Sequence, residues 1–175
     1  MLSRRSRGGH LESAEAAAIR GRFDIALAGV LSDAGLRRSE AAALIWADIR
    51  ADLDGSGRIT IRHSKTDALG QGAVAAITTA TLQALQAIRD GAAADQPVFG
   101  LSGSQIGRRV AAMAKAAGLG EGYSGHSGRV GLAARMSRRG APDSAIMRQG
   151  RWASPSMVAR YTRHEKAAAA LPYLA

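Results

Sequence analysis

Four short segments of the chain carry side chains whose types and spacing could do chemistry on a polyanion. They are residues 35–40 (GLRRSE), 63–67 (HSKTD), 125–129 (GHSGR) and 150–164 (GRWASPSMVARYTRH). Arginine offers a planar fork that fits two phosphate oxygens, lysine and histidine can move protons, and a tyrosine hydroxyl can act as a nucleophile. Each segment alone is a weak signal, because such arginines are usually solvated and a tyrosine in a late helix usually packs. The functional prediction therefore rests on their combination.

The charge of the chain indicates which polyanion to expect. Lysine plus arginine number 24 and aspartate plus glutamate number 14, so the net charge is +10 and nucleic acid is the default partner. Only three lysines are present, so arginine carries nearly all of the positive charge; they are Lys65, Lys115 and Lys166. A GC-rich coding bias accounts for the bulk arginine content equally well. It does not account for a lysine kept at position 65.

Several classes of site are excluded by composition. The chain has no cysteine, which excludes a disulfide framework, a thiolate metal site and a cysteine nucleophile. It shows no carboxylate cluster and no P-loop motif, so we expect neither a metal nor a nucleotide cofactor. No apolar stretch is long enough to cross a bilayer, so we expect a cytoplasmic protein without membrane contact.

The elements that must position the four segments follow from the hydrophobic pattern. A chain of 175 residues with 4% aromatic residues and abundant alanine favours one helix-rich domain. Alternating residues over 58–62 predict a strand, and 73–77 its antiparallel partner, with Lys65 in the loop between them. The predicted fold class is mainly α with a small antiparallel β-sheet (α+β). Helical periodicity or start signals predict helices over 12–32, 39–45, 79–91, 104–118 and 126–137 and from 142 and 154 onward.

Taken together, the four segments resemble the catalytic domain of the tyrosine recombinase (phage integrase) family, and most of all its Cre-like branch. The resemblance covers nearly the whole chain, and the block 126–164 follows the Cre-like pattern closely, with Trp where most of the family has His. Gly128 is unusual within this block, because the family mostly has a larger apolar residue there, and a glycine costs a helix about 1 kcal/mol relative to alanine. The family signature reads, in chain order, Arg37, Lys65, His126-x-x-Arg129, Trp152 and Tyr161.

The resemblance implies a role for each of these residues. Tyr161 is the implied nucleophile, which attacks a DNA phosphate and forms a covalent link to the 3′ end. Arg37 and Arg129 are implied to bind the phosphate oxygens, on which charge accumulates in the transition state. Lys65 is the implied general acid for the leaving 5′ oxygen, because a lysine can give up a proton and an arginine cannot. These four residues would form the centre of the reaction.

Three further residues would support that centre. His126 is implied to donate to a phosphate oxygen or to relay the proton of the nucleophile. Trp152 has one indole N–H, so it would make one hydrogen bond to the phosphate and otherwise pack. Glu40 would orient Arg37 or His126, although a carboxylate near a helix N-terminus is also favoured by the helix dipole. Arg38, next to Arg37, is predicted to be a surface charge or a DNA contact.

The predicted organisation and function follow from the same resemblance. Residues 1–11 would be a basic tail, 12–164 the catalytic domain, and 165–175 a tail that could dock onto a neighbouring protomer; the family's N-terminal core-binding domain is expected to be absent. The expected partners are double-stranded DNA and, on paired sites, a homotetramer, in a nucleoid-associated protein of prokaryotic, phage or mobile-element origin. The main hypothesis is a site-specific DNA recombinase or integrase. The alternatives are a type IB topoisomerase-like enzyme and a truncated remnant that only binds DNA.

Overall fold

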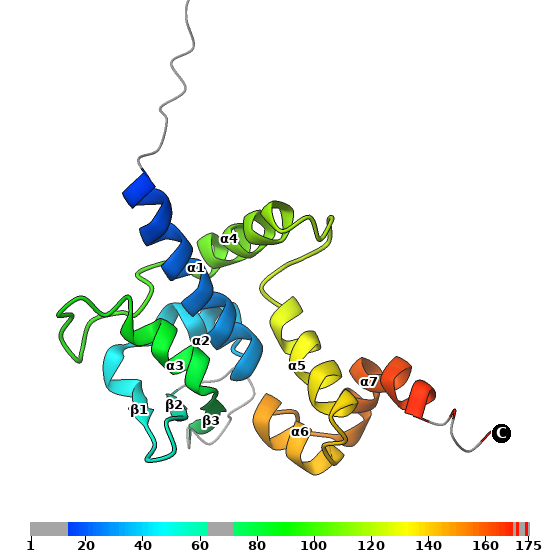
Figure 1. The fold of residues 1–175 in the computed structure, drawn as a ribbon. Helices are drawn as coiled ribbons and strands as arrows, with labels where there is room; N and C mark the ends of the chain where they lie inside the picture. The colour runs from blue at the N-terminus through cyan, green and yellow to red at the C-terminus, as the bar shows by residue number, and fades with distance from the viewer. Residues whose placement is uncertain (1–13, 63–71, 170, 172–173, 175) are drawn as a thin grey trace, which may run out of the picture.

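The computed structural model describes residues 14–62, 72–169, 171 and 174, and within them it confirms the predicted fold class. Helices dominate, and one three-stranded antiparallel sheet has the strand order β1-β2-β3 (Figure 1). None of the described helices combines the length and the apolar character that crossing a bilayer requires. The elements are α1 (Ala14–Asp33), α2 (Arg38–Ala43), a 3-10 turn (Trp46–Asp48), β1 (Ile49–Ala51), β2 (Gly57–Ile61), β3 (Ala73–Ile77), α3 (Thr79–Gln86), α4 (Gly103–Ala116), α5 (Ser127–Arg138), α6 (Asp143–Gly150) and α7 (Pro155–Ala169).

Several helix ends differ from the sequence prediction by one or a few residues. Helix α2 begins at Arg38 rather than Ser39, because the carboxylate of Glu40, inside the helix, accepts the hydrogen bond from the backbone N–H of Arg37. Helix α4 is capped by Ser102 rather than Ser104, through a reciprocal pair of hydrogen bonds with Gln105. Helix α3 ends at Gln86, before the predicted stop at residue 91.

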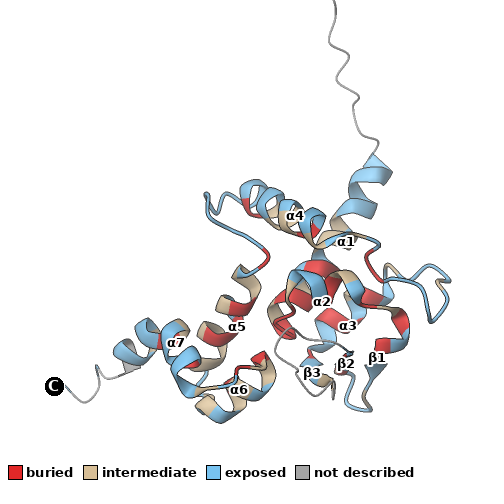
Figure 2. Ribbon diagram, turned by 180° about the vertical axis from the view of Figure 1, so that it is seen from behind, coloured by how far each residue is buried: buried red, intermediate tan, exposed pale blue. Residues whose placement is uncertain are grey.

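The buried apolar residues form two separate clusters (Figure 2). The larger cluster joins α1, α2, the sheet and α3, and it includes Ile106 of α4. Within the sheet, Ile59 and Ile61 of β2 belong to this cluster, while Arg58 before them and Thr60 between them are exposed, as period-two alternation requires. The smaller cluster lies among α5, α6 and α7, which are grouped beside the rest of the molecule (Figure 1).

A set of hydrogen bonds, called here the seam, connects the parts of the molecule that hold the two clusters. The last carbonyl groups of a helix have no partner within the helix, and here the carbonyls of residues 32–35, at the end of α1, accept hydrogen bonds from side chains of α5, α6 and the residue after α6. Three of the four donors are arginines, which also suit the negative end of the α1 dipole. The bonds are Arg135 to Ser32 O (3.0 Å), Gln149 to Asp33 O (2.7 Å), Arg151 to Ala34 O (2.7 Å) and Gly35 O (3.0 Å), and Arg129 to Gly35 O (2.6 Å).

The carboxylate of Asp33 adds further hydrogen bonds and an ion pair to the seam. It accepts hydrogen bonds from the backbone and hydroxyl of Thr78, from the Thr81 hydroxyl at 2.6 Å and from Arg135 at 2.8 Å. Burial alone would raise the pKa of Asp33, but the hydroxyl, backbone and arginine contacts outweigh it and lower the pKa below its ordinary value. Asp33 is therefore an ionised group that ties α1 to the start of α3 and to α5.

Helix α5 approaches α1 closely at Gly128. A Cβ atom placed on Gly128 would lie 2.5 Å from the carbonyl oxygen of Leu31 and 2.8 Å from its carbonyl carbon. A Cβ on Gly131, in the same helix, would meet nothing within 4 Å. The glycine at position 128, expected only to weaken the helix, therefore permits the contact between α5 and α1.

Candidate active site

The turn at residues 35–40 presents Arg37 at the start of α2. Gly35 has a φ of +56°, a conformation that favours glycine, and Leu36 is fully buried, so the chain turns sharply before Arg37. The guanidinium Nη1 of Arg37 donates to Glu40 Oε1 at 2.7 Å. Glu40, whose side chain is only 2% exposed, therefore orients Arg37 through both its backbone and its side chain.

Glu40 also accepts a hydrogen bond from Arg151 Nη2, at 2.8 Å from Oε2. Burial raises the pKa of a carboxylate, but the hydrogen bond from the Arg37 backbone, the charge of Arg151 and the Arg37 side chain act in the opposite direction and lower the pKa of Glu40 below its ordinary value. Glu40 is therefore ionised and shared by two arginines. Of the two partners predicted for Glu40, Arg37 and His126, the structure brings Arg37 to it.

Helix α5 supplies His126 and Arg129. His126 is the N-cap residue of α5, and Arg129 follows one turn later, so both lie at the N-terminal end of the helix. The side chain of Arg129 is buried, and Nη1 is fixed by the carbonyl of Gly35 at 2.6 Å. Burial, together with the charges of Arg37 and Arg151, lowers the pKa of Arg129 to about 10, so it remains a cation at neutral pH.

Tyr161, in the second turn of α7, faces His126. Its hydroxyl lies 3.1 Å from Nε2 of His126, within hydrogen-bond distance. Burial, and then the neighbouring charges of Arg129, Arg37 and Arg160, lower the pKa of His126 below its ordinary value. A histidine that is neutral at neutral pH can accept the proton of the tyrosine hydroxyl. Tyr161 and His126 are therefore arranged as a nucleophile and its base would be.

Trp152 packs against both Arg129 and Tyr161. The indole is 5% exposed and belongs to the smaller apolar cluster. The guanidinium carbon of Arg129 lies 4.9 Å from the centre of the Trp152 ring, and the Tyr161 ring lies 5.8 Å from it. Such cation–π and aromatic contacts hold Arg129 and Tyr161 in place from one side.

The structure thus brings together six of the seven residues singled out from the sequence, and these six come from three of the four segments. Lys65 lies outside the described residues. Within the described ranges, no group of three or more His, Asp or Glu side chains is arranged to hold a metal. The six residues are Arg37, Glu40, His126, Arg129, Trp152 and Tyr161.

The structure adds one residue to those predicted from the sequence. Arg151 was not singled out, because nothing in the sequence indicates that an arginine beside Trp152 reaches back to Glu40. Arg38, predicted to be a surface charge or a DNA contact, is exposed, and its side chain packs against Gly103, Gly107 and Gly125, where added Cβ atoms would touch it. Arg38, Gly103 and Gly125 border a hollow of about 450 Å³ that Arg37 and His126 also line.

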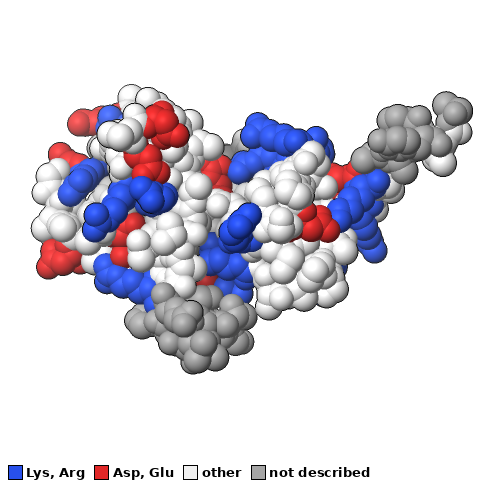
Figure 3. Space-filling model, turned by 90° about the horizontal axis from the view of Figure 1, so that it is seen from below, with Lys and Arg blue, Asp and Glu red and all other residues white. Residues whose placement is uncertain are grey.

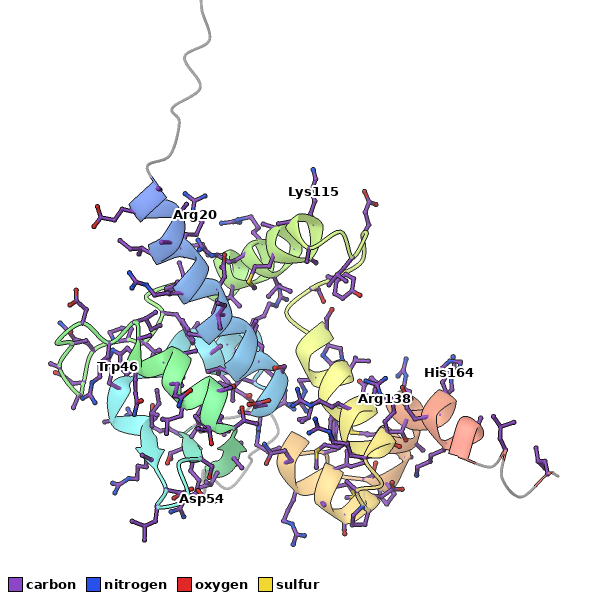
Figure 4. The ribbon with its side chains drawn as sticks, viewed as in Figure 1. Arg20, Trp46, Asp54, Lys115, Arg138 and His164 are labelled. Carbon is purple, nitrogen blue, oxygen red and sulfur yellow. The ribbon has the colours of Figure 1, made fainter. Side chains whose placement is uncertain are left out.

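Positive side chains are spread over the face of the molecule that is seen from below. Seen from below, lysine and arginine side chains lie on both parts of the molecule and at the junction between them (Figure 3). Lys115 and His164 point outward from α4 and α7 (Figure 4), and both are exposed. A surface of this kind attracts a polyanion without base specificity.

Comparisons with known proteins identify the class to which this fold and site belong. The sequence profile described as "Phage integrase family" matches residues 11–168, which is most of the chain. The chain belongs to the phage integrase family. No curated protein sequence matches it.

Solved structures support the same fold. The chain is similar to a XerA recombinase (TM-score 0.67, 21% identity, 94% of this chain and 66% of that one). It is also similar to the XerH site-specific recombinase bound to palindromic difH substrate in a post-cleavage complex (0.72, 18%, 93% and 47%). A third similar structure is the Tn1549 transposon integrase in complex with transposon right end DNA (0.59, 17%, 94% and 66%).

These likenesses establish the tyrosine recombinase catalytic-domain fold. The chain spans about half to two thirds of the length of the proteins it matches. They do not place the chain in the Cre-like branch, which stays a prediction based on Trp152 and the block 126–164. The domain boundaries drawn from the sequence likewise stay predictions.

Proposed function

We propose that this chain is the catalytic domain of a site-specific DNA recombinase or integrase, which cleaves and rejoins strands through a 3′-phosphotyrosine intermediate. The observation that carries the proposal is the 3.1 Å contact between Tyr161 Oη and His126 Nε2, beside two arginines. Charge interactions connect His126 with both Arg37 and Arg129, so the three groups surround one small region. A phosphate placed there meets a nucleophile, a base and two cations at once.

The proposed cleavage step forms one bond to phosphorus, breaks another and transfers two protons. Tyr161 Oη bonds to phosphorus while its proton passes to His126 Nε2, and the bond from phosphorus to the 5′ oxygen breaks. The proton that the leaving 5′ oxygen needs comes from Lys65, a role based on the resemblance. Rejoining reverses each transfer, so no metal and no nucleotide cofactor enters the balance. The phosphotyrosine keeps the energy of the broken bond for the second step.

Arg37 and Arg129 would stabilise the transition state. Charge develops on the non-bridging phosphate oxygens, and two preorganised guanidinium groups lower its energy more than mobile water can. Removing one preorganised donor of this kind typically costs about 10²–10³ in rate. In the proposed site Glu40 holds Arg37, while Gly35 O and Trp152 hold Arg129, so neither group must be reorganised during the reaction.

The partners and setting follow from this function. We propose double-stranded DNA as the substrate, a homotetramer on paired sites as the working assembly, and a cytoplasmic, nucleoid-associated protein encoded by a prokaryote, a phage or a mobile element. The XerH and Tn1549 proteins named above were solved with DNA, which supports the DNA assignment. No specific observation favours the topoisomerase or the DNA-binding remnant over this function.

The proposal is tested by trapping the covalent intermediate. The full chain is incubated with a pool of labelled duplexes that carry a nick beside a randomised segment, so that the cleaved fragment diffuses away and rejoining cannot occur. We expect a labelled adduct that survives SDS, and none with Tyr161→Phe, which leaves the ring in place. An adduct that forms equally well with Tyr161→Phe, or no adduct in the whole pool, would refute the proposal. Relaxation of a supercoiled plasmid without recombinant products would favour the topoisomerase alternative.

A further inference from the structure

Arg151 has two energetically unfavourable features, one in its backbone and one in its side chain. Its backbone has φ 55° and ψ 49°, the left-handed region, which is unfavourable for residues other than glycine. Its side chain is only 8% exposed, and Nε is the one buried side-chain nitrogen or oxygen without a hydrogen-bond partner among the described residues. Departures of this kind from local preference are expected where a residue has a functional task.

Both terminal nitrogens of Arg151 bond to the segment that carries Arg37, and one of them also bonds to Gln149 of α6. Nη1 donates to Ala34 O at 2.7 Å and to Gln149 O at 3.3 Å, and Nη2 donates to Gly35 O at 3.0 Å and to Glu40 Oε2 at 2.8 Å. Arg151 follows α6, directly before Trp152, so it joins the tyrosine-bearing half of the molecule to the Arg37 turn. Arg151 itself does not line the hollow beside Arg37 and His126.

The charges at Glu40 suggest what this contact achieves. Glu40 orients Arg37, but a buried carboxylate paired with Arg37 alone would cancel the positive charge that Arg37 must present to a phosphate. Arg37 occupies Oε1 and Arg151 occupies Oε2, so each oxygen has its own guanidinium. The group of three therefore carries a net charge of +1 instead of zero, and opposite charges at this distance interact strongly in a partly buried setting.

We propose that Arg151 is a positioning residue that compensates the charge of Glu40, so that Glu40 can orient Arg37 without neutralising it toward the DNA phosphate. The inference rests on the function proposed above. It differs from a purely structural clamp in one respect, because compensation matters only while Glu40 is charged. Loss of Arg151 should therefore be harmful when Glu40 is present and nearly harmless when residue 40 is a neutral glutamine.

The test measures the single-turnover rate of adduct formation, at saturating protein, on a nicked duplex recovered from the pool described above. Arg151→Gln removes the charge, and Arg151→Lys keeps it. Arg151→Gly removes the charge at a backbone conformation that glycine prefers, so it remains informative if the glutamine variant folds poorly. Arg148→Gln, on the exposed face of α6, removes one positive charge outside the network and serves as the matched control.

We expect Arg151→Gln and Arg151→Gly to slow cleavage by about 30-fold, less than the roughly 10²–10³ expected for direct loss of a phosphate-binding donor. Arg151→Lys should recover to within about 5-fold of the unmodified chain, since the charge is restored, and Arg148→Gln should change the rate by less than about 2-fold. In the Glu40→Gln background, Arg151→Gln should slow cleavage by less than about 3-fold further, because interacting residues are not additive.

Several results would overturn the proposal. The same fold loss with and without the Glu40 charge would show a structural clamp, and a lysine variant as slow as the glutamine variant would show that charge is not what matters. Unchanged cleavage by Arg151→Gln and Arg151→Gly would also refute it, while leaving the proposed function intact. Failure of the unmodified chain to form any adduct would instead refute the function and the inference together. Denaturant unfolding of every variant verifies that each is folded under the conditions of the assay.

Discussion

Replacing Gly128 by alanine should destabilise the protein, whereas the same replacement at Gly131 should stabilise it. Both glycines lie inside α5, and both are three residues or fewer from Arg129. They differ in their surroundings: a Cβ on Gly128 would lie 2.5 Å from the backbone oxygen of Leu31, and a Cβ on Gly131 would meet nothing within 4 Å. The pair therefore separates tertiary packing from helix propensity within one helix.

The expected magnitudes follow from two opposing effects. Alanine is favoured over glycine within a helix by about 1 kcal/mol, so Gly131→Ala should raise the free energy of unfolding by roughly that amount. At position 128 the added methyl group meets backbone atoms that cannot rotate away, and overpacking typically costs about 1–3 kcal/mol. Since 2.5 Å lies well inside contact distance, we take the upper part of that range, which leaves a net loss of about 1–2 kcal/mol for Gly128→Ala.

Urea denaturation followed by circular dichroism measures both changes. For a chain of this size the loss at position 128 corresponds to a melting temperature lower by about 2–8 °C. We also expect Gly128→Ala to slow adduct formation, because a shift of α5 away from α1 moves His126 and Arg129 together. A Gly128→Ala variant as stable as Gly131→Ala would refute the argument, since it would show that α5 does not depend on a close approach to α1.

Three further predictions concern the candidate site and the seam. The neutral form of His126 accepts the proton and the pKa of His126 is lowered, so the cleavage rate should fall as the pH drops through a value below 6.5. His126→Asn should remove this acidic limb of the pH–rate profile. An acidic limb that is unchanged in His126→Asn would contradict the role of His126 as the base. Asp33→Asn should lower the free energy of unfolding by about 2–3 kcal/mol at pH 7 in urea titrations. The pKa of Asp33 is lowered on folding, so its contribution is present above the ordinary value of 3.8 and is lost as the pH falls below it, and the difference between the proteins should shrink in acid. Trp152→Ala should cost about 3–5 kcal/mol in the same titrations, since it removes a buried indole, and a smaller loss would show that the Arg129 and Tyr161 contacts contribute little.

The sequence predicted the fold class and most of the elements because their signals are local. Period-two alternation located β2 and apolar spacing located α1, while β3 was predicted as the partner of β2 and α5 from the glycines that flank it. Helix starts were less well predicted, because more than one residue near a helix start can make the capping hydrogen bond. At α2 the capping carboxylate comes from Glu40 inside the helix, and at α4 the capping serine is Ser102, two residues before the predicted one.

The candidate site was predictable only where residue type and chain order carried the information. The residues of the family signature could be recognised in this way, but Arg151 could not. Its role depends on a left-handed backbone and on a carboxylate more than 100 positions earlier, and neither leaves a trace in the surrounding sequence. Gly128 was interpreted as a helix defect for the same reason, since local propensity contains no information about a neighbouring helix.

The seam at residues 32–35 has a consequence for the protein during its own synthesis. Chains are made from the N-terminus and domains fold as units, so α1 and the Arg37 turn leave the ribosome well before the side chains that cap their carbonyls. Those caps come from residues 129–151, and Tyr161 follows only ten residues later. The proposed nucleophile and the donors that bond to the Arg37 turn are therefore completed at nearly the same moment. On the proposed chemistry, a nascent or interrupted chain can attract DNA but cannot cut it.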